Sequence, residues 1–210
     1  MEEILKKIIK QDMLHAKWLN ALSFMENAGA RKISACEDPI DTNIMQLKHA
    51  AEEHRHAYYL KKQIKKLPVA GFQTYTLSSL LAGRNTHHYL HKLDIQVCRY
   101  LKSHFDLDKI NLKYAAYLLV TYAIEIRADH LYPIYQTTLD RCGSKVMVKN
   151  IIIEEKGHLQ EMVDQLQAFD PDWEIHAKQA IQMENLLFEK WMNAVSGEIL
   201  ANKEVENLDA

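Results

Sequence analysis

The hydrophobic positions along the chain recur with a helical period from one end to the other. Apolar residues fall at intervals of three and four, which places them on one side of an α-helix, and no segment alternates in the manner of a strand. Breaks in this pattern coincide with Pro, Gly and capping residues. They predict six helices, over about residues 3 to the mid-30s, 40–67, 86–105, 109–140, 145–168 and 171–200, followed by a frayed tail at 202–210.

Charged residues interrupt the apolar stripe of the second predicted helix, which begins after a capping signal at Asp38-Pro39. Glu53 and His56 lie on the same side as Leu60, whereas Glu52 falls with the lysines of the opposite side. We therefore expect Glu53 and His56 to face the core. Glu52 and His54 are expected to face solvent and to be bystanders.

The fifth predicted helix repeats the Glu-x-x-His spacing. Glu155 and His158 share a side with Ile151 and Met162, and Gly157 lies between them. Glycine is unfavourable inside a helix, so we interpret Gly157 as making room for a neighbouring helix, with room for substrate as the alternative. Two Glu-x-x-His pairs on buried stripes are a far stronger signal than one, because Glu and His are common on helices.

An acid also occupies the apolar stripe of the first and fourth predicted helices. Glu26 precedes Glu53 by 27 residues (53 − 26), and Glu125 precedes Glu155 by 30 (155 − 125), so each helical hairpin brings two acids to a similar height. An isolated carboxylate in a core is destabilising by several kcal/mol unless it is paired or bound to a metal. The pattern therefore predicts that the four acids and the two histidines meet at one site.

This duplicated pattern resembles the ferritin-like di-iron carboxylate superfamily, in which two helices each supply a Glu and two others a Glu-x-x-His. The resemblance covers about residues 3–168. It implies an all-α, ferritin-like four-helix bundle with a crossover helix at about 86–105 and a C-terminal helix at about 171–200, within a single domain of residues 1–210. It also implies two iron ions, or manganese or a mixed pair, with these ligands: Glu26, Glu53, His56, Glu125, Glu155 and His158.

Two histidine ligands and the added helices are similar to the oxidase and oxygenase branch of that superfamily. The resemblance implies an enzyme that activates O₂ to oxidise a small apolar organic substrate. Electrons would come from an external, ferredoxin-like donor, because the chain has no flavin, Rossmann or iron–sulfur motif. A monomer or dimer is expected in place of a large ferritin-type shell. A ferroxidase or iron-handling protein and a metal-free helical interaction module are the alternatives left open.

Several further polar residues are expected near the metals. A hydroxyl there could transfer protons or electrons, although core packing explains each one taken singly; the candidates are Thr121, Tyr122 and Tyr132. Candidates to hydrogen-bond a ligand are Asp129, His49 and His15. The spacing of a histidine cluster could hold a separate metal, but a solvent-facing or interhelical cluster is the favoured interpretation; its members are His87, His88 and His91, with Asp94 beyond.

Composition narrows the function classes. The 210 residues include 48% hydrophobic residues, 6 Gly and 4 Pro, which suits one compact domain with long elements. A net charge of −2 lacks the excess of basic residues that is typical of nucleic-acid binding. Charge in every turn of the first segment argues against a signal peptide or membrane span. The 3 widely spaced cysteines predict reduced thiols and a cytoplasmic protein.

Overall fold

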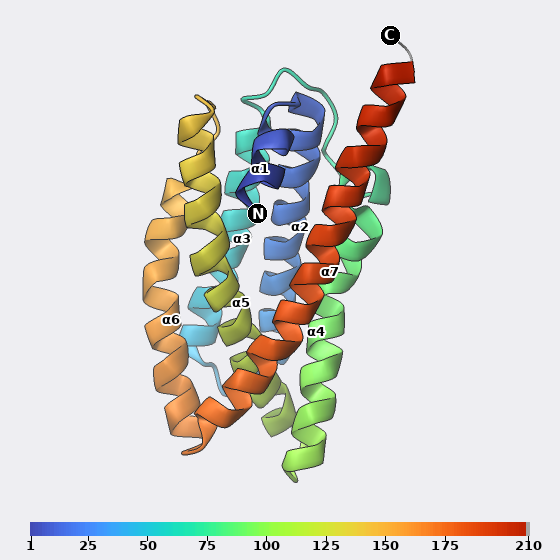
Figure 1. The fold of residues 1–210 in the computed structure, drawn as a ribbon. Helices are drawn as coiled ribbons and strands as arrows, with labels where there is room; N and C mark the ends of the chain where they lie inside the picture. Colours follow the sequence, from blue (N-terminus) through green and yellow to red (C-terminus); the bar gives the residue numbers. More distant parts are fainter. Residues whose placement is uncertain (209–210) are drawn as a thin grey trace.

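The computed structural model describes residues 1–208, and their side chains except those of Lys156 and residues 202–208. All regular structure in this part of the chain is helical, which confirms the all-α prediction (Figure 1). The elements are α1 (Glu2–Ile9), α2 (Asp12–Cys36), α3 (Ile44–Ile64), the short 3₁₀ helix η1 (Leu77–Ser79), α4 (Gly83–His104), α5 (Lys109–Arg141), α6 (Lys149–Phe169) and α7 (Trp173–Leu208).

The first predicted helix is in fact two helices. Lys10 ends α1, and Gln11 adopts an extended conformation (φ −122°, ψ 107°) before α2 begins at Asp12. Leu5 and Ile8 are fully buried, so α1 packs on the bundle as a separate element. The apolar spacing continues across the break, which is why periodicity alone predicted one helix. Asp12 then lies in the first turn of α2, where the helix dipole favours an acid.

The Asp38-Pro39 signal marks a turn and does not begin the next helix. Asp38 Oδ1 accepts hydrogen bonds from the backbone N–H groups of Ile40 and Asp41, at 2.8 and 3.0 Å. The helix α3 starts only after Asn43, whose side chain accepts from two backbone N–H groups of the first turn. Asn is among the strongest N-capping residues, so the later signal prevails over the earlier one.

Four helices enclose the inner core, and two others cover one side of it. The hairpins α2–α3 and α5–α6 pack against each other, and α4 and α7 lie side by side along α2 and α5 (Figure 1). The largest buried side chains, Trp18, Trp191 and Tyr135, lie where α2, α5 and α7 meet. The helix α7 continues to Leu208, well past the expected end, and the last two residues of the tail lie outside the described part.

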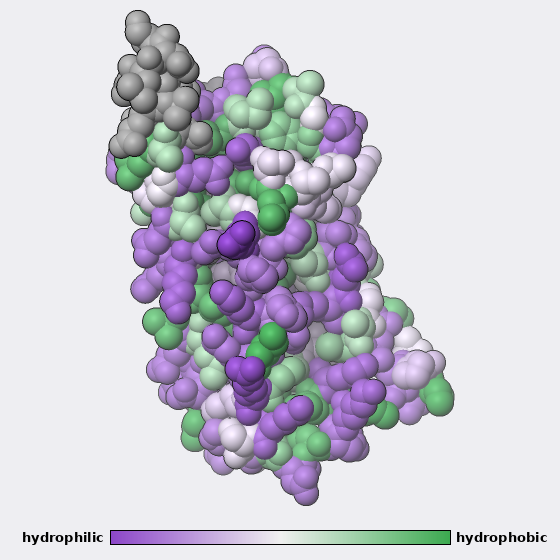
Figure 2. All heavy atoms as spheres, turned by 90° about the vertical axis from the view of Figure 1, so that its right-hand side faces the viewer, coloured by the Kyte–Doolittle hydropathy of each residue, from purple (hydrophilic) through white to green (hydrophobic). Residues whose placement is uncertain are grey.

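The face that α4 and α7 present outward is mostly hydrophilic, with hydrophobic residues scattered among the polar ones (Figure 2). Such scattered apolar side chains are normal on a protein surface. Over residues 1–208, every helix is too short or too polar to cross a bilayer. The inner faces of α4 and α7 supply apolar side chains to the core, including Leu90, Leu93 and Phe188.

Candidate metal centre

The six predicted ligands converge between α2, α3, α5 and α6. Their potential ligand atoms form two overlapping groups, and within each group all atoms lie within 4.8 Å of one another. Five of the six residues are buried, and Glu26 is half-buried. One group contains Glu53, Glu125, Glu155 and His158; the other contains Glu26, Glu53 and His56.

Glu155 lies between the two histidines and faces both of them. Its Oε1 is 3.0 Å from Nδ1 of His56, and its Oε2 is 3.0 Å from Nδ1 of His158. The two imidazole rings come from different helices, with centroids 6.3 Å apart. A carboxylate with one oxygen beside each imidazole could be shared by two ions, and Glu53 belongs to both groups of potential ligands.

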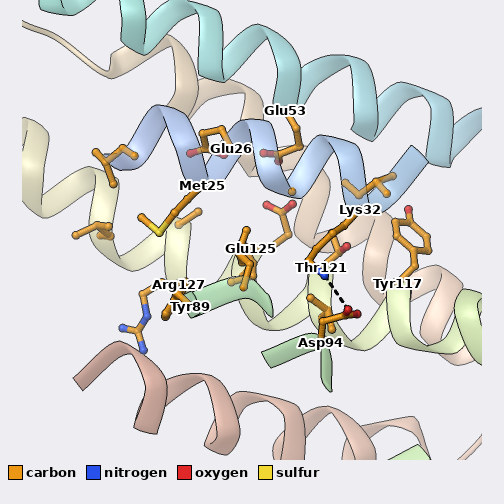
Figure 3. A pocket seen from close by; sticks show the side chains of 18 of the residues that line it. Met25, Glu26, Lys32, Glu53, Tyr89, Asp94, Tyr117, Thr121, Glu125 and Arg127 are labelled. Carbon is orange, nitrogen blue, oxygen red and sulfur yellow. Dashed lines mark hydrogen bonds and ion pairs between the residues drawn. The ribbon is translucent and has the colours of Figure 1, made fainter. Parts of the chain in front are cut away.

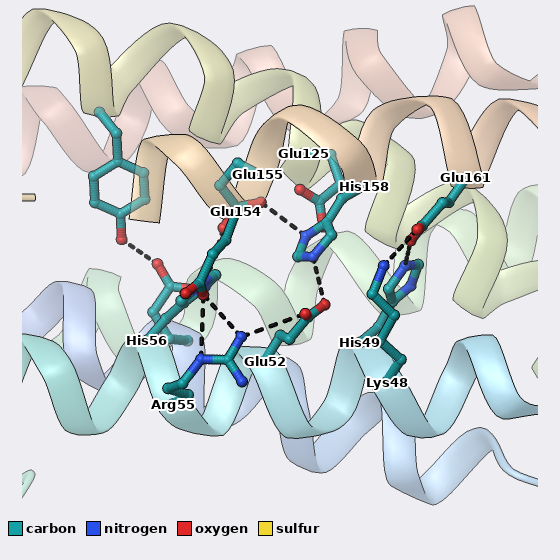
Figure 4. A network of polar contacts seen from close by, with 12 residues as sticks. Lys48, His49, Glu52, Arg55, His56, Glu125, Glu154, Glu155, His158 and Glu161 are labelled. Atoms are coloured by element: carbon teal, nitrogen blue, oxygen red, sulfur yellow. Dashed lines mark hydrogen bonds and ion pairs between the residues drawn. The ribbon is translucent and has the colours of Figure 1, made fainter. Parts of the chain in front are cut away.

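The outer nitrogen of each histidine contacts a carboxylate on the opposite helix. Nε2 of His158, on α6, lies 2.7 Å from Oε2 of Glu52, on α3. Nε2 of His56, on α3, lies 2.9 Å from Oε2 of Glu154, on α6. The prediction that Glu52 is a bystander was therefore wrong, because its position at the edge of the buried face places it against α6 (Figure 4). His54 is exposed, as expected.

Arg55 connects these two outer carboxylates. Its guanidinium donates to Glu154 through Nη2 at 2.9 Å and Nε at 3.3 Å, and Nη2 also lies 3.3 Å from Glu52. The outer carboxylates hold Nε2 of each imidazole, and Nδ1 of each ring faces Glu155, with which Nδ1 of His158 forms a hydrogen bond. Such contacts are the usual way in which proteins orient metal-binding histidines.

Two buried polar atoms at the centre have no hydrogen-bond partner among the described residues: Nδ1 of His56 and Oε2 of Glu125. Although Nδ1 of His56 is close to Glu155, the geometry is not that of a hydrogen bond. Buried polar groups are nearly always satisfied, and each exception requires an explanation. Cations held by the two groups of residues would satisfy both atoms, so the residues present fit bound metal.

Burial and mutual repulsion displace the protonation equilibria of the cluster. Burial, reinforced by Glu26, raises the pKa of Glu53, and burial together with Glu155 raises the pKa of Glu125. Burial opposes the charged forms of Glu155 and His158, but hydrogen bonds within the cluster outweigh it. They lower the pKa of Glu155 and raise that of His158 to about 11. The metal-free cluster therefore holds protons where a metal ion would otherwise supply positive charge.

A cavity of about 90 Å³ adjoins the carboxylates on the side of α4 and α7. Its wall is mostly apolar, and Glu26, Glu53 and Glu125 lie at its inner end (Figure 3). A half-exposed ion pair between Lys32 and Asp94, with Nζ and Oδ2 2.7 Å apart, lies at another edge. The four-helix bundle thus places the candidate ligands against a small hydrophobic chamber.

Of the three hydroxyl-bearing candidates, two lie at this site. Thr121 is buried and lines the cavity. The hydroxyl of Tyr132 donates a hydrogen bond to Oε1 of Glu26. Tyr122 instead packs edge-on against Trp173 of α7, with centroids 5.8 Å apart, so its predicted role at the site is not supported.

Of the three residues predicted to orient the ligands, only one lies beside the centre. Asp129 is exposed, and the prediction that it contacts a ligand histidine was wrong, because it falls on the outer side of α5. His15 is buried, but its Nε2 lies 2.6 Å from the hydroxyl of Tyr135, and no contact with a ligand is found among the described residues. His49 does lie beside the centre, with its ring centroid 5.0 Å from that of His158.

The histidines of α4 have other environments. His87 stacks on Phe24, with centroids 4.4 Å apart, and its Nε2 lies 3.0 Å from the backbone oxygen of Tyr75. His88 and His91 are exposed. Asp94 is paired with Lys32, which leaves no convergent set of ligands here and agrees with the solvent-facing or interhelical interpretation.

Sequence reasoning missed four residues around the ligands. Glu52 and Glu154 could have been found, because each directly precedes a motif glutamate and the two segments read EEHRH and EEKGH. The other two, Tyr117 and Glu161, hold Nδ1 and Nε2 of His49, both at 2.9 Å. Their contacts with His49 form between different helices, and no local sequence pattern predicts them.

Comparison of the chain with protein-family models, with curated protein sequences and with solved structures gives no match.

Proposed function

We propose that this protein is a ferritin-like, two-metal carboxylate enzyme that activates O₂ to oxidise a small apolar organic substrate. The observation that carries the proposal is the position of Glu155, with one oxygen 3.0 Å from Nδ1 of His56 and the other 3.0 Å from Nδ1 of His158. Each imidazole is held from behind by a carboxylate of the opposite helix. A packing role alone accounts for neither the duplicated geometry nor the two unsatisfied polar atoms.

The donor set favours iron or manganese. Four carboxylates and two imidazoles are hard and intermediate ligands, which suit these ions better than thiolate-preferring metals. Glu26 and His56 would hold one ion, Glu125 and His158 the other, and Glu53 and Glu155 would be shared. When bound, such a metal pair supplies redox chemistry toward O₂. The four helices would fix the ligands and exclude bulk water.

The cavity supports an organic substrate over iron itself. Its volume of about 90 Å³ is several times the 10–15 Å³ or so that a single water requires, so it admits a molecule of only a few heavy atoms. Apolar residues such as Val120, Ile124 and Leu131 line it. Hydrated iron ions would gain nothing from such a wall, whereas an apolar group would be desolvated beside the carboxylates.

A hydrogen-bonded chain connects this cavity with the surface. Tyr117 lines the cavity, and its hydroxyl lies 2.9 Å from Nδ1 of His49. Nε2 of the same ring lies 2.9 Å from Oε2 of Glu161, which is half-buried and also contacts Lys48 (Figure 4). Reduction of O₂ consumes protons, and in this proposal the Glu161–His49–Tyr117 chain delivers them to the hydroxyl of Tyr117. Electrons would come from an external donor.

Metal analysis tests the proposal directly. The protein is expressed in iron-supplemented medium beside the variants Glu53→Ala and Glu155→Ala. We expect about two metal ions per chain in the parent, as in two-metal sites generally, and a large loss in both variants, with helicity by circular dichroism as the control for folding. Equal, near-zero metal in all three proteins would leave the metal-free helical module as the explanation.

Size-exclusion chromatography combined with iron analysis separates the enzyme from an iron-handling protein. We expect a monomer or dimer that consumes O₂ in the presence of a reductant. A large shell that retains many irons per chain would contradict the oxygenase proposal and favour a ferroxidase.

A further inference from the structure

The two halves of the candidate centre differ at equivalent positions. Tyr132 follows Glu125 by seven residues on α5, and Ile33 follows Glu26 by seven residues on α2. The hydroxyl of Tyr132 crosses the core and donates a hydrogen bond to Oε1 of Glu26. Ile33 is buried at the cavity wall and has no hydrogen-bonding group to offer to Glu125.

This difference leaves the two lone carboxylates in different states. One oxygen of Glu26 accepts a hydrogen bond from the phenol of Tyr132, so the carboxylate is held in one orientation. Oε2 of Glu125 has no partner among the described residues, and Glu125 lines the cavity together with Thr121. Glu125 can therefore reorient toward a metal ion, whereas Glu26 cannot reorient without losing its bond to Tyr132.

The two half-sites also differ in the support of the carboxylates behind their histidines. Arg55 donates two hydrogen bonds, of 2.9 and 3.3 Å, to Glu154, which holds His56, and one, of 3.3 Å, to Glu52, which holds His158. The position on α6 equivalent to Arg55 is Gly157, which is exposed and offers no counterpart. The first half-site, Glu26 with His56, thus has an oriented acid and an imidazole whose Nδ1 has no hydrogen-bond partner among the described residues. In the second half-site, Glu125 with His158, Nδ1 of His158 is hydrogen-bonded to Glu155 at 3.0 Å, and a metal ion must displace this bond.

We infer that the two metal ions bind in order: the first half-site is pre-organised and binds tightly, and the second binds more weakly. This inference rests on the proposed two-metal function. Pre-organised ligands bind more tightly because less ordering remains to be done on binding. The same geometry makes Tyr132 a positioning residue for the first metal, acting through Glu26.

Titration of the metal-free protein with Mn(II), followed by electron paramagnetic resonance and calorimetry, tests this order. At one Mn(II) per chain we expect a single uncoupled Mn(II) species, and at two per chain a magnetically coupled pair. Tyr132→Phe removes only the hydroxyl and is expected to weaken the first step about 10- to 100-fold, the usual effect of losing an outer partner of a ligand, with the second step little changed.

Tyr122→Phe is the matched control, because it removes the same hydroxyl from a tyrosine of α5 that packs against Trp173, and it is expected to leave both steps unchanged. His56→Ala should abolish the tight step and His158→Ala the weak one, which guards against general unfolding as an explanation. A coupled pair already at one Mn(II) per chain, equal affinities for the two steps, or a Tyr132→Phe effect confined to the second step would overturn the inference while leaving a two-metal protein. No Mn(II) binding at all would overturn both.

Discussion

The carboxylate of Glu52 lies 2.7 Å from Nε2 of His158, across the interface between α3 and α6. The equivalent contact joins Glu154 of α6 to Nε2 of His56 on α3. Each Glu-Glu-x-x-His segment therefore supplies the carboxylate that holds the histidine of the other segment. This reciprocal exchange means that neither hairpin completes its half of the centre alone. It also identifies side chains whose effect on metal binding can be measured without removing a ligand.

Glu52→Gln and Glu154→Gln should each weaken metal binding by about 10- to 100-fold, because a neutral amide holds the imidazole less firmly and lowers its basicity. Calorimetric titration with Mn(II) measures the change. Asp129→Asn is the matched control, since this exposed carboxylate lies on the outer side of α5 and should leave the affinity unchanged. An effect of the control as large as that of Glu52→Gln would point to general electrostatics.

Metal affinity should rise with pH. The pKa of Glu53 and that of Glu125 are raised by burial, and the pKa of His158 is raised to about 11 by its carboxylate neighbours. His158 therefore holds a proton near neutral pH in the metal-free protein, and the raised pKa values of Glu53 and Glu125 make protons compete more strongly with a metal ion for these carboxylates. Calorimetry in buffers of different ionisation enthalpy counts the released protons. Binding that releases none, with an affinity independent of pH, would contradict the protonation states inferred for the cluster.

His15 should make the metal-free protein less stable in mild acid. Burial lowers its pKa from 6.5 to about 4, so the folded state keeps the imidazole neutral while the unfolded state binds a proton. Its contribution is fully present above pH 6.5 and is lost as the pH falls toward 4. The loss amounts to about 3 kcal/mol for a shift of this size.

Urea unfolding of the parent and of His15→Gln, each measured across this pH range, isolates the contribution of His15 to the free energy of unfolding. The parent should lose more free energy of unfolding on acidification than the variant does. Parallel pH profiles for the two proteins would show that His15 titrates normally in the folded state.

Gly157→Ala should stabilise the protein by about 0.5–1 kcal/mol, because an added Cβ meets open space and alanine favours a helix. The interpretation that Gly157 makes room for a neighbouring helix is wrong for the same reason. Gly83→Ala provides the contrast, since its Cβ would overlap the backbone oxygen of Leu77. Thermal unfolding of the metal-free proteins should show shifts of opposite sign, and a destabilising Gly157→Ala would contradict the open environment.

Much of the candidate centre could be predicted because the ligands violate the apolar pattern of their own helices. Glu53 and His56 occupy positions where periodicity requires hydrophobic residues, and Glu125 and Glu155 do the same. The break at Gln11 escaped prediction, since apolar residues on both sides of it keep the helical spacing. Asp129 was wrongly included because it lies one turn from Glu125. Four residues rotate the side chain by about 40° relative to Glu125, and this rotation brings Asp129 to the exposed side of α5.

The sequence by itself determined the all-helical class, the inward faces of the helices and the set of six polar groups that must share a site. These follow from helical periodicity, which is a property of each segment alone. Only the tertiary structure decided the partners of residues at the edge of a face. Glu52 is rotated by about 100° from Glu53, and whether that direction meets water or His158 depends on where α6 packs. Contact across helices is a property of the assembled bundle and leaves no periodic trace in either segment.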